Sequence, residues 1–159
     1  MNAQPQQEHH WLDRLVGEWT YEVEYSMAPG QPMSKSAGVE VVRSLGGLWT
    51  IGEGEGETPD GGSARTVMTL GYDPQAGRYV GTFVASMMTH LWSYSGSLDA
   101  AGKVLTLDTE GPSFDDKGTS KYRDSLEFID DDHRVLTSHA PGEDGQWHVS
   151  MTAHYRRKP

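Results

Sequence analysis

The sequence predicts an all-β protein: a closed antiparallel up-and-down β-barrel of about ten strands with one short N-terminal helix. Three observations predict this fold class. The segment 17–27 alternates aromatic or apolar residues with polar ones, which is typical of a strand with one packed face and one solvent-exposed face. The strand-like stretches that follow are joined by connections too short for parallel neighbours. Because only one helix is available to cover so large a sheet, the sheet must close on itself to bury a face and hide its edges.

The N-terminal segment contains the expected helix. Residues 1–6 are polar, and we expect them to be loose. Residues 7–16 place four apolar side chains on one face of a short helix, and Gly17 stands where a helix stop is expected. No domain boundary is visible after this point. We therefore expect a single barrel domain that spans residues 7–159.

Tight turns separate the expected strands. The turn at 73–78 has Asp at its first position, Pro at its second and Gly77 free to take a positive φ. Similar reversals are expected at 98–103, 130–132 and 142–145. The ten expected strands are 18–27, 36–45, 48–56, 65–72, 78–86, 91–98, 103–110, 119–129, 133–140 and 146–156.

The composition excludes several classes of protein. The chain has no cysteine, which excludes disulfides and a thiolate nucleophile and favours a reducing compartment. A formal net charge of −10 disfavours nucleic acid and anionic membranes as partners, because phosphates attract basic surfaces. Neither a secretory signal nor a run of about 20 apolar residues is visible. We therefore expect a cytoplasmic protein.

Several large side chains on the inward parity of the expected strands are candidates for ligand contact. These are Trp92, Tyr94, Tyr122, Trp147 and Met151. An aromatic-lined interior with a few hydroxyl groups is typical of a small-molecule cavity. The same rings could instead fill the barrel as core, because small barrels are often plugged by their own side chains. The sequence leaves both interpretations open.

Two charged residues, Arg43 and Asp124, share this inward parity, and a buried ion must be paired. We expect Arg43 to meet an anionic group of a ligand, and Asp124 to anchor a polar group or accept a proton. Alternatively, the two residues pair with each other or reach the rim. In an isomerase- or cyclase-type enzyme, Asp124 would act as general acid or base, with Tyr122 or Tyr94 nearby. We expect binding without catalysis.

The last expected hairpin contains four histidines. If its loop is centred on 142–145, His139 lies opposite His148 and His133 lies opposite His154. Directly opposed Cβ atoms are about 4.5–5.5 Å apart, close enough for two imidazoles to bind one metal ion. That face offers no third ligand, so exposed polar surface is the simpler interpretation and we expect no metal. A register slip of one residue would remove the pairs.

A series of short motifs runs through nearly the whole chain. They are Gly17-Glu18-Trp19, Leu45-Gly46-Gly47, Gly71-Tyr72-Asp73, Gly77-Arg78-Tyr79-Val80, Gly142-Glu143-Asp144-Gly145 and Tyr155-Arg156-Arg157-Lys158. Together they resemble a bacterial family of lipocalin-like, calycin-type β-barrels of unknown function. The resemblance implies that Trp19 lies at the closed end of the barrel with Arg157 across its indole. Some barrels of this type hold haem through a histidine of the last strand, which here would be His148 or His154.

The function that these observations favour is the binding of a small, largely apolar molecule in the lumen, with an acidic group as one option. Three alternatives stay open. They are an isomerase- or cyclase-type enzyme that uses Asp124, a haem- or metal-binding barrel, and a structural module that forms a homodimer through a barrel wall. We expect no cofactor.

Overall fold

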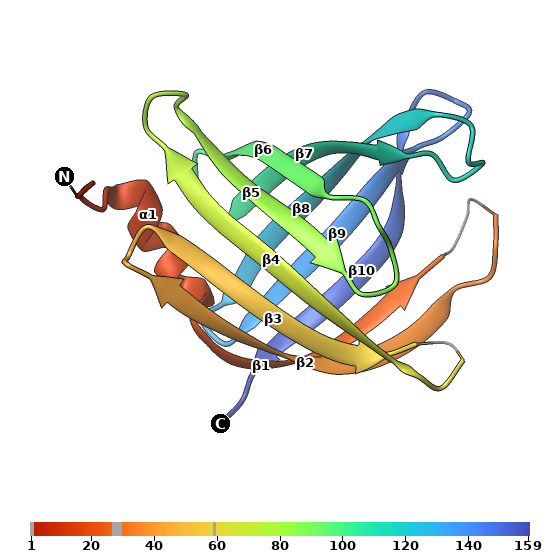
Figure 1. Ribbon diagram of the computed structural model, residues 1–159, viewed down its shortest axis with the longest axis horizontal. Helices are drawn as coiled ribbons and strands as arrows, with labels where there is room; N and C mark the ends of the chain where they lie inside the picture. The colour runs from red at the N-terminus through yellow and green to blue at the C-terminus, as the bar shows by residue number, and fades with distance from the viewer. Residues whose placement is uncertain (1, 27–29, 59) are drawn as a thin grey trace.

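Ten antiparallel strands close into a single barrel in the computed structural model, which describes residues 2–26, 30–58 and 60–159 (Figure 1). Each strand pairs with its neighbours in sequence, and the first pairs with the last to complete the ring. The predicted closed up-and-down barrel is confirmed. The elements are α1 (Gln7–Leu12), the 3-10 helix η1 (Asp13–Leu15), β1 (Gly17–Tyr25), β2 (Ser34–Leu45), β3 (Trp49–Glu57), β4 (Ser63–Asp73), β5 (Arg78–Ala85), β6 (Trp92–Leu98), β7 (Val104–Pro112), β8 (Thr119–Asp130), β9 (His133–Pro141) and β10 (Trp147–Arg157).

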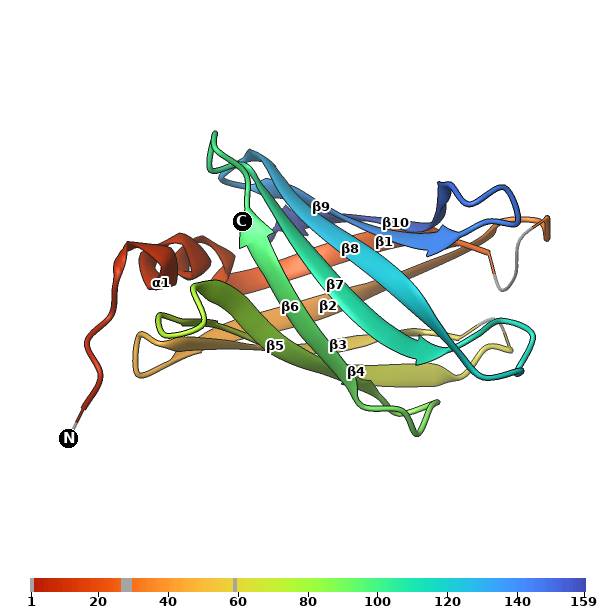
Figure 2. The ribbon, with the colours of Figure 1, turned by 90° about the horizontal axis from the view of Figure 1, so that it is seen from above.

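The two helical elements cover one end of the barrel, which we call the closed end (Figure 2). Leu12 and Leu15 are buried there, and the indole N–H of Trp19 donates a hydrogen bond to the Leu15 carbonyl at 2.8 Å. His9 is also buried, with its Nε2 3.1 Å from the carbonyl oxygen of Tyr72. The opposite end, where β1 ends and β2 begins, carries no such cover in the described residues, and we call it the open end. No helix of the described residues has the length and apolar character needed to cross a membrane.

Trp19 and Arg157 make the contact at the closed end that the resemblance to calycin-type barrels implies. Trp19 is fully buried, and the Cζ atom of Arg157 lies 4.2 Å from the centroid of its ring. The guanidinium also donates hydrogen bonds to the carbonyls of Val16 at 2.8 Å and Arg14 at 2.9 Å. A cation–π contact contributes about 0.5–2 kcal/mol. The last strand is thereby fastened to the start of the first.

The alternation predicted for β1 is present in the structure. Trp19, Tyr21, Val23 and Tyr25 are buried or partly buried, and the polar residues between them are exposed. Met27, the last residue of the predicted strand, lies outside the described residues. Because paired residues of an antiparallel ladder point to the same side, the facing of β1 fixes the facing of the strands on both sides of it.

The inward facing predicted for Arg43 is wrong. Glu40 pairs with Trp19 and therefore points inward with it, which places Arg43 on the outer face of β2, where it is exposed. Hydrophobic parity misleads in this strand because Val39 and Val41, 40% and 49% exposed, lie on the outer face. Branched side chains suit an extended backbone on either face of a sheet.

The inward facing predicted for Trp147 is also wrong. A β-bulge interrupts β10: Val149 pairs with His139, but Met151 pairs with Ser138, so that Ser150 is an extra residue in this strand. An extra residue inverts the parity. Met151 therefore faces inward with the rest of β10, whereas Trp147 and Val149 are 41% and 56% exposed.

Candidate functional site

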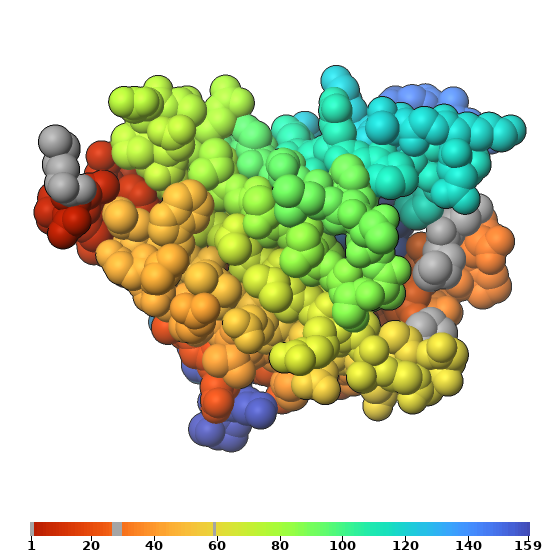
Figure 3. Space-filling view, viewed as in Figure 1, coloured from red at the N-terminus to blue at the C-terminus, as the bar shows by residue number. Residues whose placement is uncertain are grey.

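The lumen is filled with side chains from the closed end to its middle, and solvent reaches it from the open end. The largest fully buried side chains are Trp19, Leu70, Tyr79, Leu105, Leu107, Leu126 and Phe128, together with Leu12 of α1. Nearer the open end, inward side chains such as Tyr21, Phe83, Trp92 and Met151 are only partly buried. The strand register places these side chains on the inner face of the barrel, and we call this region the open half of the lumen. Figure 3 shows a hollow on this side, bordered by the green β5–β6 loop and the cyan β7–β8 loop.

A buried ion pair forms the floor of the open half. Glu40 of β2 and Arg134 of β9 bond to each other, and their side chains are 10% and 4% exposed. The Cζ atom of Arg134 lies 3.9 Å from the ring centroid of Tyr155 and 4.6 Å from that of Trp19. The Nε of Arg134 is buried and has no partner among the described residues. Because each charge neutralises the other, the floor is polar without a net charge.

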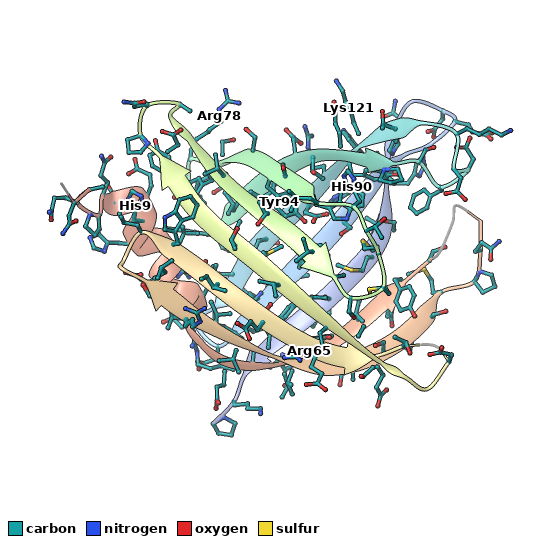
Figure 4. All side chains as sticks on the ribbon, in the orientation of Figure 1. His9, Arg65, Arg78, His90, Tyr94 and Lys121 are labelled. Carbon is teal, nitrogen blue, oxygen red and sulfur yellow. The ribbon has the colours of Figure 1, made fainter. Side chains whose placement is uncertain are left out.

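A second polar pair, Tyr94 of β6 and Asp124 of β8, lies nearer the open end. Asp124 is opposite Ser138 of β9, which is two inward positions from Arg134. The hydroxyl of Tyr94 donates a hydrogen bond to Oδ2 of Asp124 at 2.6 Å, and the side chain of Ser138 bonds to the same carboxyl group. Figure 4 shows Tyr94 about midway along the barrel. Burial raises the pKa of Asp124 above the ordinary carboxyl value, and the hydrogen bonds from Tyr94 and Ser138 oppose that shift. Burial likewise raises the pKa of Tyr94 well above 10.0, and the charge of Asp124 adds to the effect.

No cation is paired with Asp124 in the part of the chain that the structure describes. Arg43 is outside the barrel, and Arg134 is bonded to Glu40. The pairing of Arg43 with Asp124 that the sequence allowed is therefore absent. On the next strand, β7, the hydroxyl oxygen of Thr109 is buried with no hydrogen-bond partner. This part of the lumen thus holds a carboxyl group without a cationic partner and a hydroxyl group without a hydrogen-bond partner among the described residues.

Aromatic rings line the path from the open end to Asp124. Trp92 contacts Tyr122 edge to face, with ring centroids 5.5 Å apart, and His90 packs against Trp92 at 4.6 Å. The indole N–H of Trp92 points to the sulfur of Met88 at 3.2 Å, and the Tyr122 hydroxyl donates to the Pro112 carbonyl at 2.6 Å. These bonds hold both rings in place, so the wall of β6 and β8 presents preformed aromatic surface.

The opposite wall is made largely of glycine, a feature that the sequence analysis did not identify. In β3, Thr50, Gly52, Gly54 and Gly56 occupy the inward positions, and the glutamates between the glycines point outward. A Cβ atom at Gly56 would overlap the hydroxyl of Tyr21. The tyrosine ring therefore lies against the bare backbone of this wall. The alternation of glycine with glutamate was the available signal, since a strand with charged residues on one parity turns the other parity inward.

The histidines of the last hairpin do not form the predicted opposed pairs. His148 pairs with Ala140 and His154 with Val135, because the register differs from the predicted one by one or two residues. His148 instead bonds to Asp144 at 2.8 Å, whereas the rings of His133 and His154 are 3.0 Å apart at the closest nitrogens. Among the described residues, no group of three side chains could hold a metal ion. The haem and homodimer hypotheses stay predictions.

The described residues line two grooves on the outside of the barrel. One, of about 650 Å³, runs between α1 and the closed-end loops and is lined in part by Trp11, Tyr79 and Arg78. Its polar groups are already partnered: the indole N–H of Trp11 donates to the Gly102 carbonyl at 2.8 Å, and the Tyr79 hydroxyl to the Glu8 carbonyl at 3.1 Å. The other groove, of about 440 Å³, lies beside β1 and β2. Neither contains the Tyr94–Asp124 pair.

The fold and the site define a closed ten-stranded barrel with one filled end and one solvent-reached, aromatic-lined end. The chain belongs to the family described as "Protein of unknown function (DUF1579)", whose family model matches residues 4–157. A comparison with curated proteins finds no match.

Three solved structures illustrate the likeness of fold. The crystal structure of Rv2717c from M. tuberculosis is 14% identical, with a TM-score of 0.68 over 98% of this chain and 100% of that chain. The S-type phycobiliprotein lyase CPES from Guillardia theta is 12% identical, with a TM-score of 0.66 over 98% and 99%. The structure of EF1p2_mFAP2b bound to DFHBI is 12% identical, with a TM-score of 0.51 over 96% and 100%. At these identities the likeness concerns the fold alone.

Proposed function

We propose that the protein is a lipocalin-like barrel that binds one small, largely apolar molecule in the open half of its lumen. The observation that carries this proposal is the partial exposure of inward aromatic and apolar side chains at one end of a barrel whose other end is filled. Apolar walls with a few placed polar groups are typical of small-molecule sites. The absence of cysteine supports the bacterial cytoplasm as its location.

The contacts proposed for the ligand differ from those that the sequence predicts. Trp92, Tyr94, Tyr122 and Met151 lie on the inner face and supply apolar area. Arg43 and Trp147 lie on the outer face, so they take no part in the proposed site. The neighbour bound to DFHBI supports the proposal as a precedent, because it is a barrel of related fold that holds a small molecule.

A neutral solvatochromic dye such as Nile red tests this proposal. We expect saturable binding at one site per chain, with quenching of tryptophan emission. Trp92→Ala should weaken binding by about ten- to a hundredfold, because burying a large apolar side chain against a ligand contributes about 1.5–3 kcal/mol. Trp147→Ala is the matched control, since its indole lies outside the barrel. An absence of saturable binding, or equal weakening by both substitutions, would contradict the proposal.

A second candidate function is an isomerase- or cyclase-type enzyme with Asp124 as general acid or base. The observation that favours it is a half-buried carboxyl group of raised pKa, without a cationic partner among the described residues. Chromatography against isomeric standards can test it, on the molecule released from protein purified from its own host, because isomers have the same mass and differ in retention. If Asp124 is catalytic, Asp124→Asn should retain a molecule isomeric with, but different from, the one that the wild type retains. The same molecule in both proteins would rule catalysis out.

A further inference from the structure

We propose that the ligand of the open half of the lumen is an organic cation, an apolar molecule with a protonated amine that pairs with Asp124. This inference rests on the proposed binding function and names the class of ligand. The sequence allowed an acidic ligand bound by Arg43. Because Arg43 lies on the outer face of β2, the proposed ligand is cationic instead.

The charges inside the barrel support a cation. Between Trp19 and the open end, the inward charged side chains of the described strands are Glu40, Arg134 and Asp124. Glu40 and Arg134 bond to each other, which leaves Asp124 with hydrogen bonds from Tyr94 and Ser138 but with no ion-pair partner among the described residues. An ionised carboxyl group away from bulk water is costly unless a cation or hydrogen bonds compensate it. A ligand cation would provide that compensation, whereas a ligand anion would be repelled.

The hydrogen-bonding capacity around Asp124 fits an ammonium group. A carboxylate has about four lone-pair sites, and two of them are used here by Tyr94 and Ser138. The remaining sites can accept from a ligand. Thr109 lies opposite Tyr122 on the neighbouring strand, and its hydroxyl oxygen is buried without a partner. An ammonium group has three donors and no acceptor, so it can serve both the carboxylate and this hydroxyl.

The aromatic rings beside Asp124 favour the same class of ligand. Trp92 precedes Tyr94 by one inward position on β6, and Tyr122 precedes Asp124 in the same way on β8. A molecule that enters from the open end therefore passes these rings before it reaches the carboxyl group. Ring faces attract cations, with Trp the strongest. The net charge of −10 draws cations toward the protein from a distance, which adds to the same preference.

Three probes with one apolar body and different charge test the inference: 1-naphthylmethylamine, 1-naphthalenemethanol and 1-naphthoate at pH 7.5. Isothermal titration calorimetry should show the highest affinity for the amine, a lower one for the alcohol and the lowest for the acid. The amine should bind at least tenfold more tightly than the alcohol. Asp124→Asn should bring the affinity for the amine to within about twofold of the affinity for the alcohol. Asp108→Asn is the matched control, because it removes the same charge from the outer face, where Asp108 pairs with Arg123. It should leave the tenfold preference intact.

Each result decides between the two proposals. Binding of the alcohol with no advantage for the amine would overturn the cation inference and leave the binding function standing. Tightest binding of naphthoate would also overturn it. If none of the three probes binds, both proposals fail. Equal loss of the preference in Asp124→Asn and Asp108→Asn would show a long-range field rather than a contact, and would overturn the assignment to Asp124. The probe ranking in the unaltered protein decides the question even if Asp124→Asn does not fold.

Discussion

Replacing Glu40 with leucine would leave the Arg134 guanidinium buried without a carboxylate. The side chains of the pair are 10% and 4% exposed, and one nitrogen of Arg134 already lacks a partner among the described residues. Removing one member of a buried ion pair costs about 3–5 kcal/mol, because the other charge stays uncompensated. For a domain of this size, each kcal/mol lowers Tm by about 2–4 °C, so Glu40→Leu should lower it by about 6–20 °C.

The assay is thermal and urea unfolding of four proteins, followed by circular dichroism. They are the wild type, Glu40→Leu, Arg134→Met and the double variant. Leucine and methionine together remove both charges, so the double variant should recover most of the loss of either single one. Glu55→Leu, on the outer face of β3, should change stability by less than about 0.5 kcal/mol. A loss below about 1 kcal/mol in Glu40→Leu, or additive losses in the double variant, would refute this account of the floor.

Three further predictions concern other parts of the barrel. Arg157→Ala should cost about 2–4 kcal/mol in urea unfolding, because it removes the indole contact and two hydrogen bonds to carbonyls, whereas the exposed Arg156→Ala should cost little. Gly56→Ala should lower the free energy of unfolding by about 1–3 kcal/mol in the wild type and by less in a Tyr21→Phe background, because the added methyl group overlaps the tyrosine hydroxyl. Equal losses in the two backgrounds would exclude that overlap. The free energy of unfolding of the wild type should fall relative to that of Asp124→Asn as the pH rises from 3.8 through the raised pKa of Asp124 in the folded state. The reason is that Asp124 releases its proton at lower pH in the unfolded chain than in the folded one. Parallel pH profiles of the two proteins would contradict this prediction.

The overall architecture could be predicted because its signals are local. The alternation of β1 and the turn at 73–78, whose Gly77 has a φ of +67°, each depend on a few consecutive residues. Short connections then leave only antiparallel neighbours, and a sheet with one helix must close. The Trp19–Arg157 contact followed from the resemblance to calycin-type barrels and is present in the structure.

The polar interior could be predicted only in part, because the facing of a strand depends on its neighbours. Asp124 lies among apolar inward residues of β8, and its parity placed it correctly. The prediction for Arg43 was wrong because the valines that share its parity in β2 are exposed, although apolar residues at alternate positions usually indicate a buried face. The partnership of Glu40 with Arg134 spans 94 residues, so it becomes visible only when the pairing of Glu40 with Trp19 is known.

The extra residue at Ser150 decides which side chains surround the entrance of the barrel. One residue inserted between Ser138 and His139 would restore a regular ladder and rotate both strand tips by half a turn. Val149, Trp147 and His139 would then line the entrance, and Ala140 would leave it. The number of residues at this one point, rather than the identity of any amino acid, thus determines which side chains line the entrance of the same barrel.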